Sequence, residues 1–199
     1  MKGYPTLASI PQAPGDLTLT AGYGQTPEPI PRIEPTSAFR TLGVHTSPSG
    51  KQHEQIKVLR RHAQSYHDAV QSSTLTPTEA YLSFSQYLRP KLNYPLPCTT
   101  LTPAQCKQIQ APALAALLPK LHMNQHSPHT LVFSSAAYGG LGLPDLYTDQ
   151  CFGQLTLFIG HIKLKDENGQ LILSLISHQQ LFIGSSAPLF KLPFKTYQK

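Results

Sequence analysis

The segment Ala38-Phe39-Arg40-Thr41-Leu42-Gly43-Val44-His45, with the turn Thr46-Ser47-Pro48-Ser49-Gly50 after it, separates two parts of the chain that differ in pattern. Before it, runs such as Leu17-Thr18-Leu19-Thr20 alternate apolar and polar side chains, which is typical of strands. After it, helical patterns dominate. Within the segment we expect one strand with Leu42 and Val44 on the same face, while Gly43 lets another backbone come close. The sequence predicts an α+β fold, with a small antiparallel sheet in the N-terminal part followed by a mainly α-helical bundle.

A further strand is expected at Ile30–Ile33, where flanking prolines that cannot donate ladder hydrogen bonds favour a sheet edge. Pro and Gly are dense near the N-terminus, and prolines and lysines alternate with apolar residues near the C-terminus. The predicted organisation is an irregular tail at 1–14, short strands at 15–48, a helical domain at 49–183 and an extended tail at 184–199.

The first predicted helix runs from Lys51 to Ser72 and is amphipathic. Its apolar residues recur at spacings of three and four: Ile56, Leu59, Ala63, Tyr66 and Val70. Its cations lie largely on the other side and are the candidate contacts for phosphate groups: Lys51, Lys57, Arg60 and Arg61. The alternative interpretation is that these cations only solvate one face of a helix.

Two later helices begin with the same arrangement, a Thr followed by Pro and then by Glu or Gln. Thr76 with Glu79, and Thr102 with Gln105, fit a capping box, and proline suits the first helical position. Pro90 is expected to stop the first of these helices and Pro112 to interrupt the second.

Beyond them, Leu131–Phe133 is expected to be a short strand or an extended connection. The loop with Gly139, Gly140 and Gly142 lacks the Lys and Ser/Thr of a P-loop, so these glycines are interpreted as sites of close backbone approach. A helix capped by Asp145 or Thr148 follows, and the apolar helix Leu171–Leu181 is expected to be buried.

The composition favours a polyanionic partner weakly. The formal net charge is +6, yet only 13% of the residues are charged, which is low for a free-standing soluble domain. The three cysteines, Cys98, Cys106 and Cys151, suggest neither a disulfide framework nor a zinc site. No secretory peptide and no membrane span is found in the pattern, so we expect a soluble protein inside the cell, either nuclear or cytoplasmic.

No constellation of catalytic residues can be identified, and no metal, cofactor or small-molecule substrate is expected. The only metal-like spacing is that of His122, His126 and His129, and its polar, proline-containing surroundings indicate an exposed loop. No serine lies in a nucleophile elbow, and no two aspartates are adjacent.

Six segments occur in an order that resembles the C-terminal part of reverse transcriptases of non-LTR (LINE-type) retrotransposons, over residues 15 to 195. They are Gly15–Leu19, Phe39–Val44, Leu75–Ala80, Tyr94–Pro97, Thr102–Cys106 and Gly139–Leu143. The resemblance implies that the strand with Leu42, Gly43 and Val44 closes the palm and that the helices after it form the thumb.

The resemblance also implies that the fingers, most of the palm and the catalytic aspartates of the parent RNA-directed DNA polymerase are missing. We therefore expect a truncated or relic segment that is not an enzyme by itself. Its expected partners are the missing palm and fingers, and a nucleic-acid duplex bound without sequence specificity through Lys51, Lys57, Arg60 and Arg61.

A second hypothesis stays open. The chain could be a small α-helical module that binds protein through its apolar C-terminal helix and tail, with no role in nucleic-acid binding. Low charge and the apolar C-terminal sequence favour this alternative, whereas the basic helix favours the first.

Overall fold

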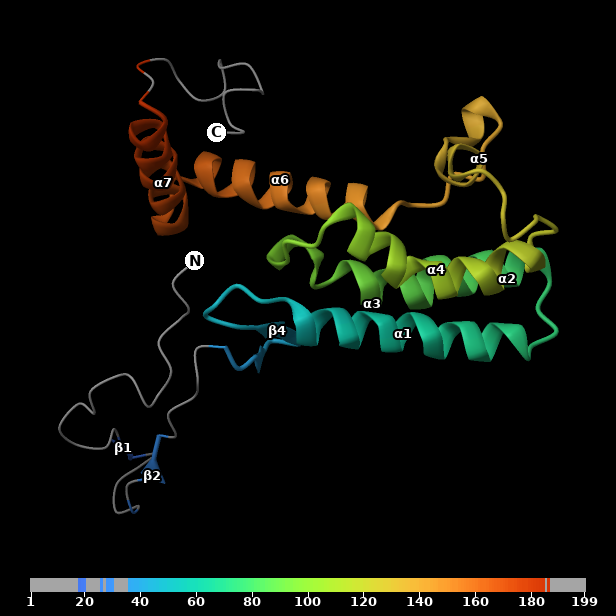
Figure 1. The fold of residues 1–199 in the computed structure, drawn as a ribbon, viewed down its shortest axis with the longest axis horizontal. Coiled ribbons are helices and arrows are strands. Elements are labelled where there is room, and N and C mark those ends of the chain that lie inside the picture. Colours follow the sequence, from blue (N-terminus) through green and yellow to red (C-terminus); the bar gives the residue numbers. More distant parts are fainter. Residues whose placement is uncertain (1–17, 21–25, 27, 31–35, 185, 187–199) are drawn as a thin grey trace. The chain divides into compact units, whose positions relative to one another are not determined.

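The computed structural model describes residues 18–20, 26, 28–30, 36–184 and 186 (Figure 1). Two small sheets near the N-terminus precede a mostly helical chain, which confirms the predicted α+β class. The chain forms two compact units. The first comprises Met1–Pro95 and Thr99–Ser127, and the second comprises Leu96–Cys98 and Pro128–Lys199. The predicted tails at 1–14 and 184–199 lie almost wholly outside the described residues.

The described strands form two separate two-stranded antiparallel sheets rather than one. β1 (Thr18–Leu19) pairs with β2 (Glu28–Pro29), and β3 (Phe39–Thr41) pairs with β4 (Val44–Thr46). Of the strand predicted at Ile30–Ile33, only Ile30 is described, and it follows β2 directly.

The segment predicted as one strand is a β-hairpin, so that prediction was wrong. Thr41 faces Val44, which leaves Leu42 and Gly43 as a two-residue turn with φ values of 49° and 87°. Positive φ at both positions is the requirement of a type I′ turn, whose twist matches that of a hairpin. Leu42 and Val44 consequently differ in environment: Leu42 is 86% exposed and Val44 only 8%. The Tyr94 hydroxyl donates a hydrogen bond of 2.7 Å to the Leu42 carbonyl and holds the turn.

α1 (His53–Gln71) and α4 (Pro103–Lys120) lie side by side and form the core of the first unit (Figure 1). The predicted apolar stripe of α1 is buried at Leu59, Ala63, Tyr66 and Val70. Gln55 is buried as well, since its Oε1 accepts a 2.7 Å hydrogen bond from the His45 backbone N–H. This bond ties the β3–β4 hairpin to α1.

Both predicted capping boxes are confirmed. Thr76 precedes α2 (Pro77–Ser83) and exchanges hydrogen bonds with Glu79, and Thr102 precedes α4 and does the same with Gln105. These starts form because each Thr and its Glu or Gln satisfy backbone N–H groups that the first helical turn leaves without partners.

The helix breaks predicted at Pro90 and Pro112 do not occur. After α2 the chain passes through a π-helical turn, η2 (Phe84–Leu88), into α3 (Arg89–Asn93), which has Pro90 in its first turn. The extra residue of the π turn keeps the Pro90 ring from the carbonyl that it would meet in a regular α-helix. α4 continues through Pro112 because its buried side chains lie on both sides of the proline. Ile109, Ala113 and Leu117 are all fully buried, and their packing outweighs one lost backbone hydrogen bond.

The second unit contains η3 (Leu96–Cys98), α5 (His129–Phe133), η4 (Ala136–Tyr138), α6 (Leu146–Leu164) and α7 (Glu167–Ile183). Of the two predicted caps, Asp145 is the one that caps α6, with its carboxylate accepting from the Thr148 N–H. The extended segment predicted at Leu131–Phe133 is instead the helix α5. Its Leu131 carbonyl accepts from the Leu141 N–H, so the glycine loop folds back on this helix.

Apolar side chains of α6 and α7 are widely exposed among the described residues, contrary to the predicted burial of the last helix. On α7, Leu171 is 62% exposed, Leu175 63%, Leu181 77% and Phe182 76%. The sequence pattern was typical of a buried helix, but no described element covers this side of α7.

Candidate nucleic-acid interface

The outer side of α1 carries the cations predicted to contact phosphate. Lys57, Arg60 and Arg61 are exposed, whereas the stripe around Leu59 and Ala63 faces the core. A helical repeat of about 3.6 residues places Lys57 and Arg61 opposite that stripe, whereas Arg60 lies beside it, toward α4. The packing of α1 against α4 therefore presents three of the four predicted residues to solvent together.

Lys51 is not part of this helical surface. α1 begins at His53, so Lys51 lies in the preceding connection. There it borders a shallow depression of about 570 Å³ together with His53, Glu54 and Gln105. The structure thus separates Lys51 from the group formed by Lys57, Arg60 and Arg61.

Lys57 is partly neutralised by a neighbour on its own helix. Its Nζ lies 2.8 Å from Glu54 Oε1, in a pair where both side chains remain about half exposed. The hydrogen bond from Lys57 lowers the pKa of Glu54, so this carboxylate stays charged beside the lysine. An exposed pair of this kind contributes little to stability, and a phosphate approaching Lys57 also meets a negative charge.

Arg60 joins α1 to α4 across the surface. Its Nη2 donates a 3.4 Å hydrogen bond to Oε1 of Gln108, which lies 48 residues further along the chain. Lys107, the neighbour of Gln108, is exposed on α4 and adds a cation that the sequence did not identify. To identify Lys107 from the sequence, one would have to know which side of α4 faces α1, and the sequence pattern does not show this.

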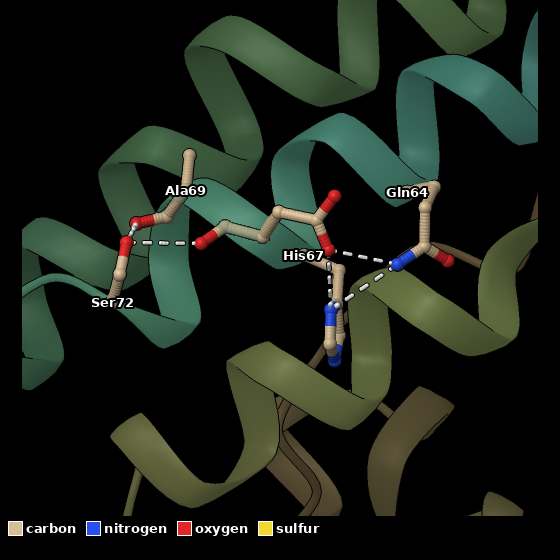
Figure 2. Close-up of polar contacts among 5 residues, drawn as sticks. Gln64, His67, Ala69 and Ser72 are labelled. Carbon is tan, nitrogen blue, oxygen red and sulfur yellow. Dashed lines mark hydrogen bonds and ion pairs between the residues drawn. The ribbon is translucent and has the colours of Figure 1, made fainter.

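The C-terminal half of α1 carries a negative charge, that of Asp68, in contrast to the cations near its N-terminal end. Gln64 Nε2 donates to Asp68 Oδ1 at 2.8 Å, and His67 Nδ1 lies 3.2 Å from the same oxygen (Figure 2). These hydrogen bonds, that of Gln64 first, lower the pKa of Asp68. A carboxylate held in its charged form repels phosphate. The positive part of the α1 surface is therefore the stretch from Lys57 to Arg61.

The glycines of the second unit have structural positions. A Cβ on Gly140 would lie 2.2 Å from the Ser134 carbonyl oxygen, so only glycine fits where the loop meets the end of α5. Gly139 and Gly142 have φ values of 78° and 64°, a region that glycine adopts without strain. In the hairpin of the first unit, Gly43 likewise has a positive φ, 87°, which glycine adopts without strain.

No cluster of potential metal ligands is formed by the part of the chain that the structure describes. Within it, no three His, Cys, Asp or Glu side chains come together in a group that could hold a metal ion, and this includes His122, His126 and His129. Among the same residues, no helix has both the length and the apolar character needed to cross a membrane.

Comparisons with protein-family models, with curated proteins and with solved structures found no significant match to the chain.

Proposed function

We propose that the first unit is a thumb-like module of the reverse-transcriptase type that binds the backbone of a nucleic-acid duplex without reading its sequence. The observation that carries this proposal is the solvent-exposed group of Lys57, Arg60 and Arg61, fixed on a helix whose apolar side is buried. Phosphate contacts need positive charge and shape but no base-specific hydrogen bonds.

The position of Arg60 supports the same proposal. Its hydrogen bond to Gln108 limits the freedom of a long side chain and joins two helices into one surface. A guanidinium can donate to Gln108 and to a phosphate at the same time, because it has five N–H donors.

The module is proposed to be without enzymatic activity. Phosphoryl transfer by two metal ions needs clustered carboxylates, and the sequence contains no two adjacent aspartates. In this proposal the palm and fingers of a polymerase are the partners that would supply catalysis, and the site of action is where nucleic acid is found, in the nucleus or cytoplasm.

The test is the salt dependence of duplex binding. The double variant Arg60→Gln/Arg61→Gln removes two charges while keeping helix propensity close. If both arginines contact phosphates of duplex DNA, the slope of log K against log salt becomes shallower by about 2, equally for unrelated sequences. Fluorescence anisotropy with two duplexes of different sequence, from low to moderate salt, measures this slope.

The matched control is Lys163→Gln/Lys165→Gln, which removes the same charge from exposed positions of α6 and its C-terminus. The control is expected to keep the slope of the unmodified chain. Equal slopes for the unmodified chain and the arginine variant would refute the proposal and leave the basic surface as a solvated helix face.

A protein-binding module is the second candidate, and the exposed apolar side chains of α7 favour it. Leu171, Leu175, Leu181 and Phe182 are each more than half exposed, which is unusual for a patch that has no partner. A complete lack of duplex binding at low salt, by a chain whose circular dichroism shows folded helices, would favour this candidate over the first.

A further inference from the structure

A groove of about 470 Å³ lies between the β3–β4 hairpin, α1 and α3, all within the first unit. It lies on another side of α1 from Lys57 and Arg60: His62 borders it, and this residue is adjacent in the helix to the buried residues Leu59 and Tyr66. None of Lys57, Arg60 and Arg61 lines the groove, although Arg61 is the neighbour of His62 in the chain.

Three cationic or basic side chains from three different elements border this groove. They are Arg40 of β3, His62 of α1 and Lys91 of α3. Among the described residues that line the groove, none is an aspartate or glutamate, and no described carboxylate forms an ion pair with these three. The outer surface of α1 is different, since Glu54 and Asp68 interrupt it.

Of the other two cations that border the groove, Lys91 acts on His62 electrostatically, and Arg61 on the outer surface of α1 does so as well. The pKa of His62 is lowered, first by burial of the imidazole and then by the charges of Lys91 and Arg61. An anion bound between these groups would reverse the electrostatic part of this shift.

An aromatic contact holds the Lys91 side chain, and two hydrogen bonds hold the hairpin that carries Arg40. The Lys91 ammonium lies 3.6 Å from the centroid of the Tyr87 ring, an aromatic contact that leaves its charge unneutralised. Tyr94 is tied to the hairpin by its hydrogen bond to the Leu42 carbonyl. The hairpin is in turn tied to α1 by the hydrogen bond between His45 and Gln55, so Arg40 is carried on a fixed support.

Apolar side chains also line the groove. They are Val58 and Leu59 of α1, Pro90 of α3, and Pro95 shortly after α3. Apolar surface beside a cation lowers the local dielectric constant, which strengthens the attraction between that cation and a bound anion.

From this arrangement we infer that the groove between the hairpin, α1 and α3 is a binding site for a phosphomonoester, contacted by Arg40, His62 and Lys91. The phosphate belongs either to a free mononucleotide or to the 5′ end of a nucleic-acid strand. Both present the same dianionic group, whose oxygens accept charge-assisted hydrogen bonds from guanidinium, ammonium and imidazolium.

The test follows the His62 ring by NMR in the full chain with labelled histidine. Inorganic phosphate, adenosine 5′-monophosphate and an oligonucleotide with and without a 5′-phosphate are titrated in separate series at constant ionic strength. At least one of the phosphate-bearing probes is expected to shift the His62 resonances saturably and to raise the pKa of His62. If the mononucleotide alone does so, the ligand is a free nucleotide; a preference for the 5′-phosphorylated strand over the 5′-hydroxyl strand identifies the strand end.

Lys91→Gln and Arg40→Gln are each expected to weaken binding about tenfold, the usual effect of one lost charge-assisted hydrogen bond. The control Lys163→Gln, an exposed cation of α6, is expected to leave it unchanged. Arg60→Gln/Arg61→Gln should affect duplex binding more than this site. His62 resonances that do not respond to any of the probes, or equal affinities in the unmodified chain and both groove variants, would overturn the inference.

Discussion

The replacement Leu42→Asn is expected to stabilise the protein, although it removes an apolar side chain. Leu42 has a φ of 49°, in the left-handed region that costs a branched residue about 1–2 kcal/mol. Its side chain is 86% exposed, so little packing is lost, and the hydrogen bond from Tyr94 goes to a backbone carbonyl that Asn also has. Asn-Gly is the preferred pair for a type I′ turn.

From these terms we expect a gain of about 1 kcal/mol in the free energy of unfolding, since Asn tolerates the left-handed region but does not remove its cost fully. For a chain of this length, that gain raises Tm by about 2–4 °C. Circular dichroism melts and urea titrations measure both quantities.

Gly43→Ala is the matched variant of opposite sign. Gly43 has a φ of 87°, and a Cβ there would meet Cε1 of Tyr94 at 3.4 Å, an ordinary contact distance, so the cost comes from backbone strain. We expect a loss of about 1–2 kcal/mol. A continuous strand would give the reverse order, because Asn disfavours strands. A destabilised Leu42→Asn together with a neutral Gly43→Ala would therefore refute the hairpin turn.

Two further predictions concern the second unit. Gly140→Ala is expected to lower the free energy of unfolding by about 2–4 kcal/mol, since the new Cβ would overlap the Ser134 carbonyl and displace the loop. The control Gly160→Ala, in open space on α6, should raise it by about 0.5–1 kcal/mol. Urea titration measures both, and similar values for the two variants would contradict the close approach at Gly140. Hydrogen bonds from His161 and from the Gly169 N–H lower the pKa of Asp166, so its stabilising effect is full above the ordinary pKa of Asp, about 3.9, and is lost as the pH falls through the lower pKa of the folded state. Melts of the unmodified chain and of Asp166→Asn should converge as the pH falls through this range, and a constant difference would contradict it.

Local contacts were predictable from the sequence, and contacts that depend on packing were not. The capping boxes of Thr76 and Thr102 involve partners three residues away, so their sequence pattern is enough to specify them. Pro112 looked like a helix end because its local cost is real, but burial of Ile109 and Ala113 outweighs that cost. Only the folded chain shows this balance.

Contacts at the candidate interface and in the groove are likewise of two kinds, those predictable from helical spacing and those that depend on packing. The pair of Lys57 with Glu54 is a helical neighbour contact that the spacing already contains. The contact of Arg60 with Gln108 joins residues far apart in the chain, and the groove unites Arg40, His62 and Lys91 from three elements. Without the packing of α1 against α4 and of the hairpin against α1, nothing in the sequence connects these residues.

The π-helical turn at Phe84–Leu88 limits how the chain can change in length. A π turn accommodates one residue more than an α turn, and here the Arg89 N–H bonds back to the Phe84 carbonyl. Deleting one residue, such as the exposed Gln86, would restore α spacing and bring the Pro90 ring against the carbonyl of the preceding turn, at a cost of about 3 kcal/mol. A deletion of one residue in an exposed loop changes only a loop-closure entropy, which varies slowly with length. Selection on this segment would therefore act on the number of its residues before it acted on their identity.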